Sequence, residues 1–240
     1  LDADDWLVPE GIASNVEHLL AQKEVAFTSG TFDAYYMEDK VFQAQGMSVT
    51  ENHYLHLLQG NYIGMVATVL FRRWVLQEFM FDPTLKNCED YDLYLRIARK
   101  YPVSHHQAKI AVYRFHTSNM SGNIPKMLQG TLATLDRQQG VLQNQQELQA
   151  YRKGRAVWKN YYSKQLYHSL VKTNQKASSQ ALLTFFRHKP LYLLKYSLQT
   201  DKAMVKQNVK KMIPAAWLRY LHQNNLYKNF MPPVGKVKFG

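Results

Sequence analysis

Apolar side chains recur at helical spacing in two segments of the first half of the chain. In residues 9–23 they fall three or four positions apart, so we expect a helix there. In residues 89–101, Leu93 and Ile97 share one face and basic residues gather at the end, as the helix dipole favours. This pattern predicts a second helix, and a proline follows it.

Short runs of β-branched and aromatic residues between these helices predict strands. Residues 25–28 and 32–37 are separated by Ser29-Gly30-Thr31, which predicts a tight turn between two strands. Residues 41–45 predict a third strand. The predicted elements of the first half of the chain therefore indicate an α/β fold, in which helices flank a sheet.

Two further segments complete the predicted sheet. Residues 61–71 hold the longest apolar run, ten residues, which is too short to cross a hydrocarbon layer of about 30 Å as a helix and predicts a buried strand. Val112, Arg114 and His116 alternate along another predicted strand, so Arg114 and His116 face the same side.

The second half of the chain predicts helices in place of strands. The segments with helical spacing are residues 127–135, 141–151, 158–170, 181–186 and 191–198. From Pro232 onward the sequence is typical of an extended tail. We therefore divide the chain at residue 122, into a sheet-forming part, 1–122, and a basic helical part, 123–240.

Charge separates the same two halves. Residues 1–120 hold 10 Lys and Arg against 15 Asp and Glu, a net charge of −5, and residues 121–240 hold 20 against 3, a net charge of +17. Trp217 and Tyr220 accompany the basic residues. This composition suits a helical region that binds an anionic membrane surface, and equally a solvated appendage packed on the first half. Nucleic-acid binding is a third reading, but no recognition motif supports it and we do not expect it.

The single cysteine and the first residues of the chain bear on its setting. Cys88 alone cannot form an internal disulfide, which fits a reducing, cytoplasmic location, peripheral at the inner face of a membrane if the basic half binds there. Beside acidic residues it is expected to be a packed thiol. The chain begins with Leu1-Asp2, without the pattern of a secretory leader, and Leu1 reads as the end of a buried strand. We therefore expect a longer protein of which this is a part.

Two acidic clusters, far apart in sequence and flanked by apolar residues, predict one polar site assembled by folding. They are Asp2-Ala3-Asp4-Asp5 and Glu89-Asp90-Tyr91-Asp92. Carboxylates at the start of a helix also stabilise it by themselves, so the second cluster is open to a purely structural reading.

Three motifs carry a resemblance to a known family. LDADDWLVPEGI, NCEDYDLYLRIARKYPV and AVYRFHTSNMS, in this order, resemble the second part of a family 2 glycosyltransferase with the GT-A fold. The resemblance covers residues 1 to about 121. It implies an α/β nucleotide-sugar transferase fold, and transfer with inversion from a nucleotide-diphosphate-sugar donor to a hydroxyl of a glycan or lipid-linked acceptor, as in cell-envelope polysaccharide synthesis.

The resemblance also implies roles for individual residues. The Asp-x-Asp turn would bind Mn²⁺ or Mg²⁺, with Asp4 the direct ligand and Asp2 facing the metal or the donor ribose. Arg114 and His116 would bind the leaving diphosphate, and in some relatives the histidine reaches the metal. A structural reading is also open, in which Arg114 pairs with a carboxylate and His116 caps the next helix.

In the acidic helix the implied roles differ between neighbours. Asp90 matches the family's general base, which removes the proton of the acceptor hydroxyl. Glu89 would orient the site, and Asp92, two residues on, is expected to be structural.

The sequence departs from the family in two places. Residues 78–82 read Glu-Phe-Met-Phe-Asp where many relatives have Gly-Gly-Phe-Asp, which changes the loop on the acceptor side. The family's first strands, which hold the nucleobase pocket, have no counterpart here, so we expect this chain alone to be inactive.

Two other classes of function deserve comparison. One is a catalytically inactive relative that serves as a binding module, against which the intact Asp4 and Asp90 argue. The other is a haloacid-dehalogenase-type phosphatase, which also uses an Asp-x-Asp strand end. That class needs Thr or Val where this chain has Asp5-Trp6, and it gives no role to the other two motifs.

Overall fold

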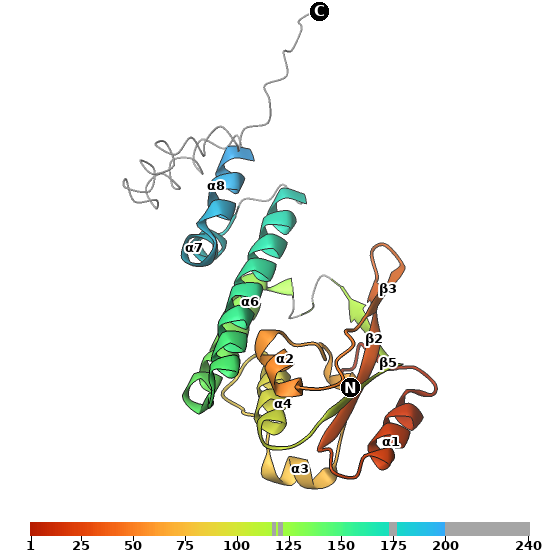
Figure 1. Ribbon diagram of the computed structural model, residues 1–240. Coiled ribbons are helices and arrows are strands. Elements are labelled where there is room, and N and C mark those ends of the chain that lie inside the picture. The colour runs from red at the N-terminus through yellow and green to blue at the C-terminus, as the bar shows by residue number, and fades with distance from the viewer. Residues whose placement is uncertain (117–118, 120–121, 173–176, 200–240) are drawn as a thin grey trace, which may run out of the picture. The chain divides into compact units, whose positions relative to one another are not determined.

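The computed structural model describes residues 1–116, 119, 122–172 and 177–199 (Figure 1). The chain forms two compact units, residues 1–158 and 159–240, which are described separately. Because α5 and the first half of α6 belong to the first unit, this division lies beyond the sequence-based one at residue 122. Residues 200–240, including Trp217, Tyr220 and the tail from Pro232, lie outside the described residues.

The described residues form an α/β structure, as predicted, whose elements follow the chain in a fixed order. They are β1 (Trp6–Leu7), α1 (Gly11–Ala21), β2 (Phe27–Tyr36), β3 (Val41–Gln45), α2 (His53–Gln59), η1 (Val66–Thr68), β4 (Val69–Phe71), α3 (Arg73–Glu78), α4 (Glu89–Lys100), β5 (Ser104–Phe115), α5 (Ile124–Gln138), η3 (Gln139–Val141), α6 (Gln145–Lys172), α7 (Ser179–His188) and α8 (Pro190–Gln199). No helix among them is long and apolar enough to cross a membrane.

The five strands form one mixed sheet. Its order is β1-β5-β2-β3, and β4 also pairs with β2. Only β2 and β5 run parallel, whereas β1 pairs antiparallel with the end of β5, Trp6 opposite Val112. This pairing brings the start of the chain to the third of the three motifs. In Figure 1, α1 lies on one side of the sheet and α2 and α4 on the other.

The predicted turn at residues 29–31 is wrong, because β2 continues through it. The pairing of β2 with β5 changes register between Ser29 and Thr31, which makes an irregularity at Gly30. A Cβ on Gly30 would lie 2.5 Å from the carbonyl oxygen of Ala108, so only glycine allows the two strands to approach this closely.

The predicted strand at residues 61–71 is also largely wrong. Only Val69–Phe71 forms a strand, β4. At the start of the segment, the Asn61 side-chain oxygen accepts hydrogen bonds from the amides of Ile63 and Gly64, both at 3.2 Å, and holds a turn. Ile63 and Met65 are buried without belonging to a strand, and Val66–Thr68 forms the short helix η1.

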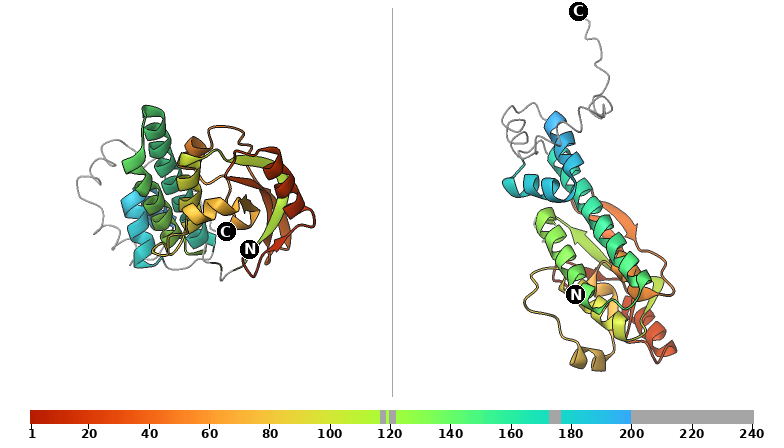
Figure 2. Two further views of the ribbon diagram at one scale, coloured as in Figure 1. Left: turned by 90° about the horizontal axis from the view of Figure 1, so that it is seen from below. Right: turned by 60° about the vertical axis from the view of Figure 1, so that its left-hand side comes forward.

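Helix α4 is the centre of the first unit. Its fully buried side chains are Tyr91, Leu93, Tyr94, Leu95 and Ile97. One side packs on the sheet, where the rings of Tyr94 and Phe27 lie 5.7 Å apart. The other side meets α2 and the first half of α6, since the Tyr91 hydroxyl donates to the carbonyl of Leu57 and its ring lies 6.3 Å from that of Trp158. Figure 2 shows these helices in a layer beside the sheet.

The described part of the second unit is helical, as predicted. Helices α7 and α8 pack through a buried strip that includes Phe185 and Leu193. The Tyr196 hydroxyl accepts a hydrogen bond at 3.0 Å from the amide of Ala177, ahead of α7, and so joins the beginning and the end of this hairpin.

Candidate functional site

The acidic turn before β1 is fixed to the end of β5. The Asp5 amide donates to the carbonyl of Asp2 at 3.2 Å, which closes the turn. The buried Asp5 carboxylate accepts a hydrogen bond at 2.8 Å from the backbone amide of Arg114. Asp5 therefore acts as a positioning residue. Asp2 and Asp4, in the same turn, are more exposed to solvent than Asp5.

Asp4 and His116 form a pair that joins the first and third motifs. Nε2 of His116 lies 2.8 Å from Oδ2 of Asp4, across 112 residues of sequence. This hydrogen bond lowers the pKa of the Asp4 carboxyl below its usual value. Both side chains remain partly exposed, so a ligand can reach them.

Arg114 lies beside this pair in a partly apolar setting. Its guanidinium lies over the ring of Trp6, 5.1 Å from the centroid, in a cation–π contact. Its Nε is buried and has no hydrogen-bond partner among the described residues. A buried donor without a partner is costly, and an anion bound here would satisfy it.

Asn119, to which the sequence analysis gave no role, closes the turn after β5. Its side-chain nitrogen donates to the carbonyl of Arg114 at 3.2 Å, and its side-chain oxygen accepts from the amide of His116. These bonds fix the backbone on both sides of His116. Its place three residues after the histidine in the third motif was the only signal in the sequence.

Asp90 lies in the first turn of α4, after Cys88 in a left-handed backbone conformation with φ of 59°. Its Oδ1 accepts a hydrogen bond from the Tyr91 amide at 2.7 Å. Burial first, and then the negative charges of Glu89 and Asp2, raise the pKa of Asp90 to about 6 against the effect of that hydrogen bond. Because the charge of Asp2 acts on Asp90 and on Asp5, folding brings the two acidic clusters into electrostatic range.

Tyr94, one helical turn beyond Asp90, places a second polar group in this region. Its hydroxyl is fully buried and has no hydrogen-bond partner within the described ranges. Burial raises the pKa of Tyr94, and the charges of Asp90 and Glu89 add to the shift. The sequence pattern gave Tyr94 no role in the site.

The metal-binding residues implied by the resemblance come together only in part. Within residues 1–116, 119, 122–172 and 177–199, no group of three or more His, Cys, Asp or Glu side chains is placed to hold a metal ion. Asp4 and His116 are two adjacent groups of suitable chemistry, a carboxylate and an imidazole. A divalent cation here would need further ligands from water or from the diphosphate of a donor.

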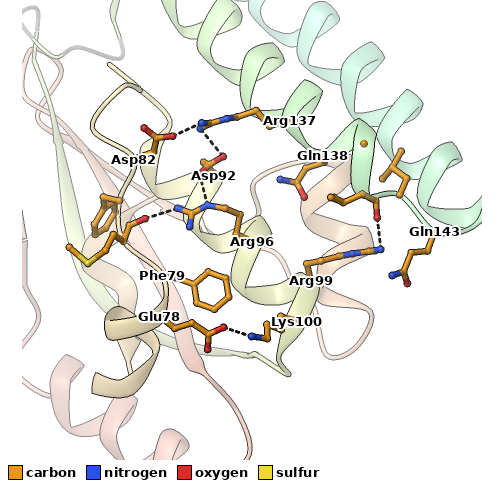
Figure 3. Close-up of a pocket in the computed structure, with 15 residues that line it drawn as sticks. Glu78, Phe79, Asp82, Asp92, Arg96, Arg99, Lys100, Arg137, Gln138 and Gln143 are labelled. Carbon is orange, nitrogen blue, oxygen red and sulfur yellow. Dashed lines mark hydrogen bonds and ion pairs between the residues drawn. The ribbon is translucent and has the colours of Figure 1, made fainter.

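A groove of the first unit lies away from these residues. It encloses about 1140 Å³ between residues 78–82, the outer face of α4 and residues 137–143 (Figure 3). The residues that line it do not include Asp2, Asp4, Asp90, Arg114 or His116.

The charged residues of this groove are engaged with one another. Asp92 is buried and bonds Nε of Arg96 at 2.7 Å and Nη1 of Arg137 at 3.2 Å, and Arg137 also bonds Asp82 (Figure 3). Asp92 is therefore structural, as predicted. The network ties residues 78–82, where the sequence departs from the family, to α4 and α5.

Cys88 is a packed thiol, as expected. Its Sγ lies 3.4 Å from Oγ1 of Thr131 on α5, and burial raises the pKa of the thiol to about 11. At neutral pH the side chain is protonated, so it is unsuited to act as a nucleophile.

Several histidines pack against the sheet away from these acids. The rings of His18 and His106 stack with centroids 3.8 Å apart, on the α1 side. His53 contacts Tyr62 at 2.8 Å on the other side. Burial lowers the pKa of His53 and of His106 to about 4, so both are neutral at physiological pH.

Comparison of this chain with models of protein families and with curated protein sequences finds no match. The chemistry of the site and the three motifs therefore carry the evidence for a function.

Proposed function

We propose that this chain carries the general base and the cation-binding side of an inverting glycosyltransferase of the GT-A type. The donor is a nucleotide-diphosphate-sugar, and the acceptor is a hydroxyl of a glycan or of a lipid-linked glycan of the cell envelope. The observation that carries this proposal is Asp90, whose pKa of about 6 is set by burial and by the nearby charges of Glu89 and Asp2. A base with a pKa close to the working pH is the most effective.

The proposed reaction uses Asp90 on the acceptor side. As the acceptor oxygen attacks the anomeric carbon, the Asp90 carboxylate takes the hydroxyl proton, and the bond to the diphosphate breaks on the opposite face of the sugar. At pH 7 a group with this pKa is mostly ionised, yet it is a stronger base than an ordinary aspartate. The charge of Glu89 next to Asp90 contributes to the raised pKa of Asp90.

The donor side of the proposed site is the Asp4–His116 pair with Arg114. The pair would hold Mn²⁺ or Mg²⁺, with Asp2 close by, and such an ion neutralises charge on a leaving diphosphate. The unpartnered Nε of Arg114 would donate to a diphosphate oxygen. Asp5 and Asn119 hold the backbone around these groups in position.

A binding module without catalysis is the second candidate. The small number of cation ligands favours this candidate. Among the described residues, only Asp4 and His116 of the implied ligands are in direct contact with each other. The raised pKa of Asp90 favours the enzyme, because pure binding of a sugar does not need a group tuned for proton transfer.

A transfer assay with the Asp90→Asn variant tests the proposal. The longest form of the protein that its gene encodes is assayed with nucleotide-sugars and Mn²⁺, and donor binding is measured by isothermal titration. We expect kcat to fall by about 10²–10⁴-fold, with donor affinity unchanged, because Asp90 acts on the acceptor.

The control is Asp39→Asn, which removes the same charge from an exposed position in the β2–β3 turn. Unchanged turnover in Asp90→Asn would rule out the proposed base. Donor binding without any transfer by the wild type would favour the binding module.

A further inference from the structure

The chain around the α7–α8 hairpin carries only one sign of charge. Residues 149–200 include seven Lys and three Arg and neither Asp nor Glu, a formal charge of +10. Arg155 forms an ion pair with Asp136, but residues 149–200 hold no acidic residue of their own. A partner for this region is therefore expected to be anionic.

The hairpin leaves large apolar side chains exposed although its interior is filled. Ala181, Leu182 and Phe185 of α7 and Leu193, Leu194 and Tyr196 of α8 are buried. In contrast, Leu183, Phe186 and Leu191 are 43%, 37% and 46% exposed. Leu183 and Phe186 are three residues apart on α7 and so share one face of the helix.

Basic residues lie among these exposed apolar ones. The sequence from Phe186 to Leu191 reads Phe-Arg-His-Lys-Pro-Leu, which places two cations between two exposed apolar side chains at the corner of the hairpin. Lys195 is exposed one turn beyond Leu191 on α8. We call Leu183, Phe186, Arg187, Lys189, Leu191 and Lys195 the hairpin corner.

We propose that the hairpin corner docks on an anionic lipid surface. Leu and Phe side chains enter the boundary between headgroups and acyl chains, while Lys and Arg remain at the level of the charged headgroups. Nucleic acid would satisfy the cations, but it offers no apolar layer for Leu183, Phe186 and Leu191. The inference does not depend on the proposed sugar transfer.

Vesicle sedimentation of the purified protein tests this docking. We expect binding to vesicles of phosphatidylglycerol and phosphatidylcholine, weaker binding at high salt, and little binding to phosphatidylcholine alone. Each cation near the surface contributes about fivefold in partitioning, so Arg187→Gln with Lys189→Gln should weaken binding by roughly 25-fold. Phe186→Asp with Leu191→Asp should weaken it at least as much.

Control variants place changes of the same kind in the first unit. Lys23→Gln with Lys86→Gln removes two charges from exposed positions, and Leu20→Asp alters an apolar side chain that is 67% exposed on α1. These variants should bind vesicles like the wild type, and circular dichroism checks that every variant is folded.

Three results would overturn the inference. The first is equal binding to neutral and anionic vesicles, and the second is equal weakening by the control and hairpin-corner variants. The third is vesicle binding that persists when the apolar side chains of the corner are replaced, while single-stranded nucleic acid competes for it. That result would assign the cations to nucleic acid.

Discussion

Replacing Asp90 by asparagine should stabilise the folded chain at neutral pH, although it removes the proposed base. In the folded state the Asp90 carboxylate is partly buried near the charges of Glu89 and Asp2, and in the unfolded state it is solvated. Asparagine has nearly the same shape, carries no charge, and keeps an oxygen for the Tyr91 amide. The substitution therefore removes mainly the cost of burying a negative charge.

The magnitude follows from the pKa of Asp90, which rises from 3.8 to about 6 on folding. Each pKa unit corresponds to about 1.4 kcal/mol, so the ionised carboxylate costs the folded state roughly 3 kcal/mol. Below a pH of about 4 the group is neutral in both states and the cost vanishes. Between about pH 4 and 6 the folded state retains its proton longer, so the stability of the wild type falls as pH rises, and above about pH 6 the full cost applies.

Urea unfolding of the wild type and Asp90→Asn across this pH range measures the effect. We expect a gain of up to about 3 kcal/mol at pH 7 that disappears near pH 4. Asp92→Asn is the matched control on the same helix, since its carboxylate is buried in ion pairs with Arg96 and Arg137. Because these arginines are 32% and 39% exposed and partly screened, its loss should cost on the order of 2 kcal/mol. A destabilised Asp90→Asn, or a gain that does not change with pH, would refute the reasoning.

Two further predictions concern packing and acid stability. In Gly154→Ala the new Cβ would overlap with the carbonyl oxygen of Leu58, so the free energy of unfolding should fall by about 1–3 kcal/mol. Gly140→Ala, with nothing within 4 Å of its new Cβ, should not lower it, and equal urea midpoints would contradict this contrast. Because burial lowers the pKa of His53 and His106 from 6.5 to about 4, their contribution to stability is complete above about pH 6.5 and is lost toward pH 4. When the pH falls from about 6.5 to 4, the double variant His53→Asn with His106→Asn should lose less free energy of unfolding than the wild type. An equal loss would contradict the lowered pKa values of these two histidines.

The helices were largely predictable because their signal is local. Apolar spacing and a following proline set α4 at Glu89–Lys100, within a residue of the predicted end. Strand boundaries depended on contacts that the sequence does not reveal. Gly30 sits in a continuous strand because the backbone of Ala108 approaches it, and the side chain of Asn61 replaces a strand ladder with a turn.

The site was predictable as a set of motifs but not as a set of contacts. The order of the motifs led us to expect Asp4 and His116 in one place, and the antiparallel pairing of β1 with β5 is the physical reason why they meet. The contact of Trp6 with Arg114 arises from the same pairing. No local pattern encodes these contacts, since their partners lie on different elements.

The pH dependence of sugar transfer tests the proposed role of Asp90 most directly. It is measured as kcat/KM for the acceptor at saturating donor and Mn²⁺, from about pH 5 to 8. With a base whose pKa is about 6, kcat/KM should rise about tenfold per pH unit below that value and level off above it. Asp90→Asn should remove this rise along with most of the activity. A wild-type rate that is independent of pH through this range, or an Asp90→Asn variant that retains the same rise, would contradict the account.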